Sequence, residues 1–182
     1  ENVKLAWQTT LDQREWQTLE RLAISLYDIL QRWWNREVLP MVEDGIRRLD
    51  AELQSNSAGA EEGQGAIRVA LVRTLATAGE YHIHLGHVAK ALDYLNRGRG
   101  LLVGEWQQSE VKSLAYAQIT RILGFAVYYH GEFARAAALY EEALSIYTQI
   151  RPSEIPYTLL LLSQVYERTG RYDDAEKCLR PP

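Results

Sequence analysis

Three stretches of the chain carry the same sparse pattern of glycine, alanine and aromatic residues, and this repetition constrains the fold more than any local feature. In the clearest copy two glycines, Gly124 and Gly131, lie seven positions apart, and alanines follow five and twelve positions after the second. This spacing predicts a helical hairpin with a tight turn at the second glycine and small residues where the two helices approach. The copies are Ala78, Gly79, Gly86, Ala91 and Leu95; Leu123, Gly124, Gly131, Phe133, Ala136, Tyr140 and Ala143; and Leu162, Tyr166, Gly170, Tyr172 and Ala175.

The repeated pattern resembles the tetratricopeptide repeat (TPR). The resemblance implies an all-α fold, a right-handed superhelical solenoid of antiparallel helix pairs with about four irregular repeats. The turn glycines Gly86, Gly131 and Gly170 are 45 and 39 residues apart, whereas a standard TPR has about 34 residues. We therefore expect longer helices or longer connections than a standard repeat has.

We predict a single TPR-like domain over residues 1–182. Residues 1–54 are expected to form a degenerate first repeat and an N-terminal cap, and residues 66–182 three clearer repeats, the last incomplete. Between them, residues 55–65 are small and polar and predict a flexible loop. Helices are expected over residues 3–10, 12–35, 39–53, 66–85, 88–102, 110–130, 132–149, 156–169 and 172–179.

The first long helix follows from apolar residues at steps of three and four. Asp12 is a candidate cap for its start, and Asn35 can adopt the left-handed turn at its end. Pro40 fits the first turn of the following helix, where a missing N–H donor costs little.

Composition limits the classes of partner. The net charge of −4 provides no basic field, so we expect neither nucleic acid nor a membrane as a partner. The single cysteine, Cys178, excludes an internal disulfide and favours a reducing, cytoplasmic location. The sequence begins with Glu1 and stops within its last repeat, which we interpret as a fragment of a longer protein.

A histidine cluster is the strongest enzymatic candidate. His82, His84 and His87 lie within six residues and could ligate a metal. On one helix, however, only His84 and His87 share a face, and the nearest carboxylate is Glu80. We favour solvated histidines at a helix end over a metal site, and any further role of this cluster stays open.

Other catalytic patterns are weaker. No glycine-rich phosphate loop ends in Gly-Lys-Ser or Gly-Lys-Thr, and the stretch 98–104 lacks the lysine. The pairs Glu61-Glu62 and Asp173-Asp174 diverge on a helix and fit helix N-terminal charge better than acid–base chemistry. We therefore predict no catalytic residues, no cofactor and no enzyme activity in this fragment, although a parent protein could be an NTPase.

The first helix of each pair lines the groove of a helical solenoid. Counting from Gly79, Gly124 and Ser163 in the TPR pattern places aromatic and polar residues there, which suits an extended protein segment. Alternatively, part of this face packs against other domains, or Phe125 lies between repeats. Replacing Arg121 and Tyr128 is expected to leave folding nearly unchanged. The predicted groove residues are Arg73, Glu80, Gln118, Arg121, Phe125, Tyr128, Tyr157 and Gln164.

A second candidate surface is the aromatic and basic cluster of Trp33 and Trp34 with Arg32 and Arg36. Tryptophan and arginine are enriched among residues that dominate binding energy. A core role for these tryptophans is the alternative.

The opening segment, residues 1–8 with the sequence Glu-Asn-Val-Lys-Leu-Ala-Trp-Gln, resembles the segment that opens the TPR region of bacterial STAND-type signalling ATPases and related transcriptional activators. The resemblance implies that nucleotide-binding and winged-helix domains precede this region. It also implies a sensor that binds a ligand protein or peptide and holds the ATPase inactive until then. A free-standing TPR adaptor that binds a peptide in its groove is the alternative.

Overall fold

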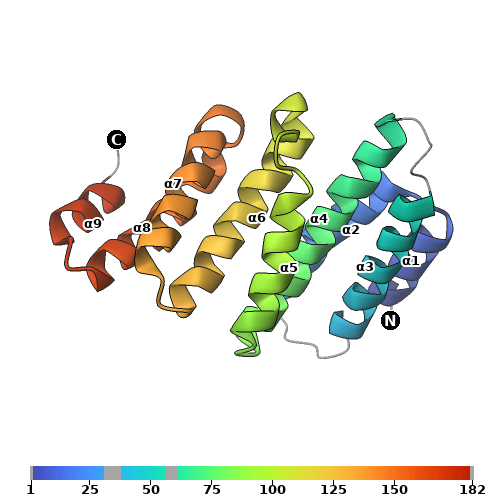
Figure 1. The fold of residues 1–182 in the computed structure, drawn as a ribbon, viewed down its shortest axis with the longest axis horizontal. Coiled ribbons are helices and arrows are strands. Elements are labelled where there is room, and N and C mark those ends of the chain that lie inside the picture. Colours follow the sequence, from blue (N-terminus) through green and yellow to red (C-terminus); the bar gives the residue numbers. More distant parts are fainter. Residues whose placement is uncertain (1, 31–37, 56–60, 181–182) are drawn as a thin grey trace.

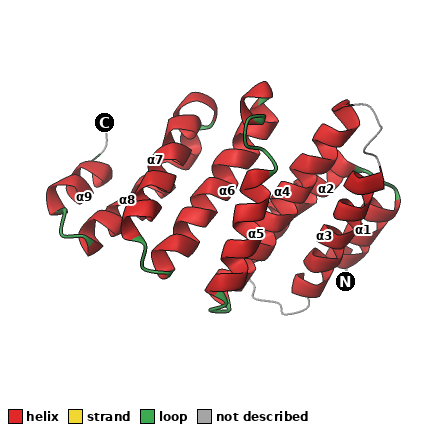
Figure 2. Ribbon diagram, in the orientation of Figure 1, coloured by secondary structure: helices red, strands yellow, loops and turns green. Residues whose placement is uncertain are grey.

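The computed structural model describes residues 2–30, 38–55 and 61–180, and within these segments the chain forms helices joined by turns and connections, without a strand (Figures 1 and 2). The helices stand side by side in a row, and the two ends of the chain lie at opposite ends of it (Figure 1). The helices are α1 (Asn2–Asp12), α2 (Trp16–Leu30), α3 (Val38–Ser55), α4 (Glu61–His84), α5 (Val88–Gly100), α6 (Glu110–Tyr129), α7 (Phe133–Ile150), α8 (Ile155–Arg168) and α9 (Tyr172–Leu179).

The row is a solenoid of helix pairs. Three helix pairs pack as hairpins: α4 with α5, α6 with α7, and α8 with α9. Helix α4 also packs on both α2 and α3, and so connects these N-terminal helices to the rest of the solenoid. Helix α1 closes the N-terminal end against α2 and α3, with Trp7 buried beside Gly45. The all-α solenoid expected from the repeats is confirmed.

The three predicted turn glycines adopt the left-handed conformation. The φ angles are +76° at Gly86, +88° at Gly131 and +75° at Gly170, a region that residues with a Cβ enter at a cost. At each turn the amide after the glycine donates back to a carbonyl five residues earlier, as from Glu132 to Val127 at 3.1 Å. These bonds satisfy carbonyls that the helix end leaves open.

Small residues lie where the paired helices approach. Ala91, Ala136 and Ala175, each five positions after a turn glycine, are buried in the core. At the glycine site of the first helix, a Cβ added to Gly79 would lie 2.6 Å from the Leu95 Cγ. The sparse pattern in the sequence therefore marks helix–helix contact points.

The long spacing between the first two turn glycines comes from a long connection. Helix α5 ends at Gly100 and α6 begins at Glu110, and a short 3₁₀ helix, Trp106–Gln108, lies between them. The Trp106 ring stacks on Tyr116 of α6 with ring centroids 5.3 Å apart. Stacking and burial hold this connection against the repeat that follows.

Two boundaries differ from the sequence-based expectation. Asp12 does not cap a helix: it ends α1, and its carboxylate accepts a bond of 2.5 Å from Arg48. Residues 61–65 are helical, whereas the predicted loop extended to residue 65. Acidic side chains in the first turn of a helix are attracted by the positive end of the helix dipole, and this attraction favours a start of α4 at Glu61. Residues 56–60 and Asn35 lie outside the described residues.

Helix α4 is the shared centre of the fold. Residues 69–83 are buried without interruption, because α2 and α3 cover part of the helix and α5 and α6 cover the rest. Leu71 and Leu75 belong to the N-terminal core, whereas Val72 and Ala76 belong to the core that extends to α9. A helix covered from several sides shows no simple amphipathic pattern.

Candidate protein-binding groove

Helices α2, α4 and α6 enclose an open hollow of about 840 Å³ on one face of the solenoid. Helices α4 and α6 are each the first helix of a hairpin, and α2 packs on α4, so the hollow lies on the face that the repeat pattern predicts to be the groove. It is lined by Gln17, Glu20, Arg21, Ile24, Gly65, Ala66, Val69, Arg73, Gln108, Ser109, Val111, Lys112, Leu114 and Arg151.

A smaller hollow of about 230 Å³ shares four lining residues with the first. The shared residues are Ile24, Arg73, Leu114 and Arg151. We call the two together the groove. The second hollow adds Gln118, Arg121, Tyr147 and Glu154.

Arg73 lies at the junction of the two hollows and is only 4% exposed. Its guanidinium donates a hydrogen bond to the Gln118 side chain. Its Nε lies 3.4 Å from Glu20 Oε1, a distance of an ion pair, but forms no hydrogen bond. Burial lowers the pKa of Arg73, the Glu20 carboxylate opposes this shift, and the positive charge of Arg151 adds to it.

Arg121 is also buried, and neighbours on three elements hold it. Its Nε lies 3.5 Å from the Tyr147 hydroxyl of α7, and Nη2 lies 3.7 Å from a Glu154 carboxylate oxygen. Its guanidinium stands 4.9 Å from the ring centroid of Tyr157 on α8. A guanidinium over an aromatic face is attracted by the ring quadrupole, so Arg121 connects consecutive repeats.

Some of the eight predicted groove residues line the groove and others lie outside it. Arg73, Gln118 and Arg121 line the groove, and Tyr157, 44% exposed, borders it through Arg121. Besides Tyr157, four predicted residues line neither hollow. These are the buried Glu80, the half-buried Phe125 and Tyr128, and the exposed Gln164.

Phe125 and Tyr128 belong to an aromatic cluster at the end of α6. The Phe125 ring meets Tyr129 edge-on with centroids 4.9 Å apart, and Tyr128 meets Phe133 of α7 at 5.5 Å. Arg168 of α8 donates a hydrogen bond of 3.1 Å to the Tyr128 hydroxyl. Both Phe125 and Tyr128 pack partly against the core, so this cluster supports the repeat junction as well as the surface.

Sequence reasoning missed much of the groove. Arg21 and Ile24 lie on α2, whose degenerate repeat has no glycine site from which to count. Arg151 follows the end of α7 and lies outside the helix that the repeat pattern assigns to the groove. The only sequence signal for α2 is its strong apolar stripe, which identifies a helix but not a binding face.

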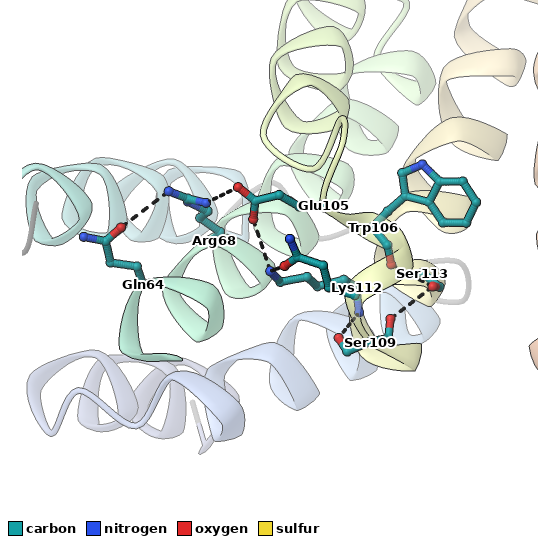
Figure 3. Close-up of polar contacts among 8 residues, drawn as sticks. Gln64, Arg68, Glu105, Trp106, Ser109, Lys112 and Ser113 are labelled. Atoms are coloured by element: carbon teal, nitrogen blue, oxygen red, sulfur yellow. Dashed lines mark hydrogen bonds and ion pairs between the residues drawn. The ribbon is translucent and has the colours of Figure 1, made fainter. Parts of the chain in front are cut away.

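A polar network adjoins the groove, whose lining includes Ser109 and Lys112 (Figure 3). Glu105 in the connection before α6 accepts from Arg68 of α4 at 2.5 Å and from Lys112 of α6 at 3.1 Å. The hydrogen bond from Lys112 holds the pKa of Glu105 below its usual value, and Arg68 lowers it further. Ser109 caps α6 by accepting from the Lys112 backbone amide at 3.2 Å. The network ties the long connection to α4 and α6.

The histidines are arranged differently from the sequence-based expectation. The turn at Gly86 brings His82 and His87 together, with their Nδ1 atoms 3.4 Å apart, while His84 lies near Phe125. In the described segments, no three His, Cys, Asp or Glu side chains gather as metal ligands would. The candidates Trp33 and Trp34 lie outside the described residues.

Helices in the described segments lack the length and apolar character needed to cross a membrane.

Comparison with known proteins agrees with the repeats and the fold. Residues 119–151 match the tetratricopeptide repeat family. No curated protein matches the chain. Among solved structures, the crystal structure of BtubC (BKLC) from P. vanneervenii superposes with a TM-score of 0.55 at 15% identity, covering 97% of this chain and 75% of that one. The chain is therefore a TPR-like helical solenoid, a fold typical of protein-interaction domains.

Proposed function

We propose that this chain is the protein-binding sensor region of a multidomain signal-transduction ATPase of the bacterial STAND type. In this proposal the groove binds a ligand protein or peptide, and the region contributes to autoinhibition of the ATPase. The region itself has no catalytic role and carries no cofactor, in keeping with the typically non-catalytic TPR fold.

The groove is the observation that carries the proposal. An open hollow of about 840 Å³ with mixed apolar and charged walls suits a protein segment that offers both kinds of group. The ATPase context rests on the resemblance of residues 1–8. Residues 2–8 of this segment belong to α1, which packs on α2 and α3 at the end of the solenoid.

Several further points belong to the proposal. Residues 1–182 act as one domain, because α4 contributes to both parts of the core. The protein works in the cytoplasm, next to the nucleotide-binding and winged-helix domains of its parent chain, and binds neither nucleic acid nor a membrane.

The mechanism would be a population shift. A ligand that binds the groove more tightly in the open form of the parent protein moves the equilibrium away from the autoinhibited form. The size of that shift equals the difference between the ligand's binding free energies for the two forms.

The test is the ATPase rate of the full-length parent with and without this region. We expect removal of the region to raise basal ATP hydrolysis, because an inhibitory contact is lost. An unchanged rate, or a coding sequence without a phosphate-loop motif upstream of Glu1, would contradict the sensor proposal.

A free-standing adaptor is the second candidate. One observation favours it: residues of α2, α4, α6, α7 and the connections before α6 and after α7 line the groove from within this chain. A start codon immediately before this region and peptide binding without any coupled activity would support the adaptor.

A further inference from the structure

The charge of the groove is opposite to that of the whole chain. The chain has a net charge of −4, yet basic side chains outnumber acidic ones among the described residues that line the two hollows. The basic residues are Arg21, Arg73, Lys112, Arg121 and Arg151, and the acidic ones are Glu20 and Glu154.

These cations divide into two groups. Arg73 and Arg121 are buried and already contact neighbours within the fold. Arg21 and Arg151 are exposed, and neither guanidinium forms an ion pair within the part of the chain that the structure describes. Exposed arginines without an anion at the edge of a hollow are available to a ligand.

Apolar side chains line the same hollows as these arginines and form an apolar floor. Ile24 of α2 and Leu114 of α6 line both hollows and are half-buried. Val69 lies beside them on α4, and Val111, which is 50% exposed, extends the apolar surface toward the first turn of α6. An apolar side chain of a ligand would remove this surface from water.

We propose that the groove binds a protein segment in which an apolar side chain is flanked by carboxylates. The apolar side chain contacts Ile24 and Leu114, while Arg151 and Arg21 bind the acidic residues on either side. This inference rests on the proposed protein-binding function and specifies the chemistry of the partner.

Electrostatics within the groove favour such a ligand. Burial is the main cause of the lowered pKa of Arg73, and the like charge of Arg151 adds to it. A carboxylate bound by Arg151 would offset that repulsion as well as forming a charge-assisted pair with the guanidinium. Both contributions act at the junction of the two hollows, where Arg73 and Arg151 each line both spaces.

A nucleic acid fits the same surface less well. A phosphate backbone would leave the apolar floor unfilled, and the net charge of −4 repels a polyanion at longer range. An acidic protein segment matches both the apolar floor and the local positive charge.

The test selects ligands for the full 182-residue chain from a displayed library of random peptides, without assuming a sequence. We expect the enriched peptides to carry Asp or Glu on both sides of a large apolar residue. For a synthetic copy of the leading peptide, Arg151→Glu should weaken binding by about tenfold or more, because it replaces an attraction with a repulsion.

Controls separate a charge effect from a loss of structure. Arg47→Glu on α3 makes the same charge change at an exposed arginine away from the groove and should leave peptide affinity unchanged. Replacing the acidic residues of the peptide with Asn and Gln should weaken binding to the parent chain but much less to the Arg151→Glu variant. The melting temperature of each variant verifies its fold.

The outcomes distinguish the two proposals. Enriched peptides without acidic residues, blocked by Val111→Arg, would overturn the present inference and leave groove binding intact. Equal binding of a thymidine oligonucleotide would overturn it as well. No enriched peptide, or peptides unaffected by both Val111→Arg and Arg151→Glu, would contradict the proposed function itself.

Discussion

The ring of Tyr140 lies so close to Gly124 that a Cβ added to this glycine would stand 2.8 Å from Tyr140 Cε1. Tyr140 is buried on α7, and Gly124 lies on the facing side of α6. The pair sets the distance between the helices of the hairpin, and Gly79 with Leu95 does the same in the preceding one. Each contact therefore sets the distance between a groove helix and the helix behind it.

Gly124→Ala should destabilise the chain by about 1–3 kcal/mol, because the ring or the helix must move to admit the methyl group. Gly63→Ala is the matched control: it also lies in a helix, but an added Cβ meets nothing within 4 Å. We expect the control to be neutral or stabilising by up to about 1 kcal/mol, the helix propensity difference. Denaturant unfolding measures both, and a destabilising effect of similar size in the two variants would contradict the contact.

Ala136 provides a second test of the repeat register. It is fully buried on α7, so Ala136→Leu should overpack the hairpin and lower the free energy of unfolding by about 1–3 kcal/mol. Ala138, on the same helix, is exposed, and Ala138→Leu should change stability by less than about 0.5 kcal/mol. If the two variants unfold at the same denaturant midpoint, the assigned contact face of α7 is wrong.

Acidification should weaken the fold through His82. Burial lowers the pKa of His82, and the nearby charge of Lys90 lowers it further, while Glu43 opposes the shift. The unfolded chain therefore takes up this proton at a higher pH than the folded chain. Stability should fall as pH decreases below 6.5, the ordinary pKa of a histidine side chain.

Glu43 extends the loss to lower pH. Burial raises the pKa of Glu43, but hydrogen bonds from Lys90, Tyr94 and His82 outweigh this effect and lower it below 4.5. The stability that Glu43 contributes is present above that value and is lost as pH falls through the folded pKa.

Melting temperatures should decline less between pH 7 and about 5.5 in His82→Gln than in the parent chain. An equal decline would contradict the assignment.

Arg121 and Arg151 should separate stability from binding. Arg121→Ala removes the contacts to Tyr147, Glu154 and the Tyr157 ring, so we expect a loss of about 1–3 kcal/mol. This revises the expectation that replacing Arg121 leaves folding unchanged, since the side chain is buried. Arg151→Ala, at an exposed position, should stay within about 0.5 kcal/mol of the parent. Unaltered melting of Arg121→Ala would show that its contacts contribute little.

The sequence predicted the repeated hairpins well because their turns and contacts require small residues. Gly131 needs a left-handed backbone and Ala136 a close helix approach, so each leaves a recognisable residue type at a fixed position. The groove does not require a particular residue type at a fixed position of the repeat. Arg21 and Arg151 come from a degenerate repeat and from a connection, and only the folded chain brings them to one surface.

The burial of individual side chains was a second property that the spacing of residues in the repeat could not predict. Counting along α6 places Arg121 and Tyr128 on the groove side, but the approach of α7 and α8 decides that Arg121 is enclosed. The count also left open whether Phe125 lies between repeats, and in the structure both Phe125 and Tyr128 pack partly against the core. Side-chain exposure depends on neighbouring repeats, and that information lies outside the repeat itself.

The most direct test of the central claim is photo-crosslinking of the selected peptide, carrying a benzophenone group, to the full chain, with the attachment positions read by mass spectrometry. If the groove is the binding surface, the crosslinks will fall on residues that line it, in α2, the first half of α4 and the first half of α6. Arg151→Glu should abolish these crosslinks, while Arg47→Glu should leave them in place. Crosslinks confined to α3, α5 and α7, unchanged by Arg151→Glu, would contradict the claim.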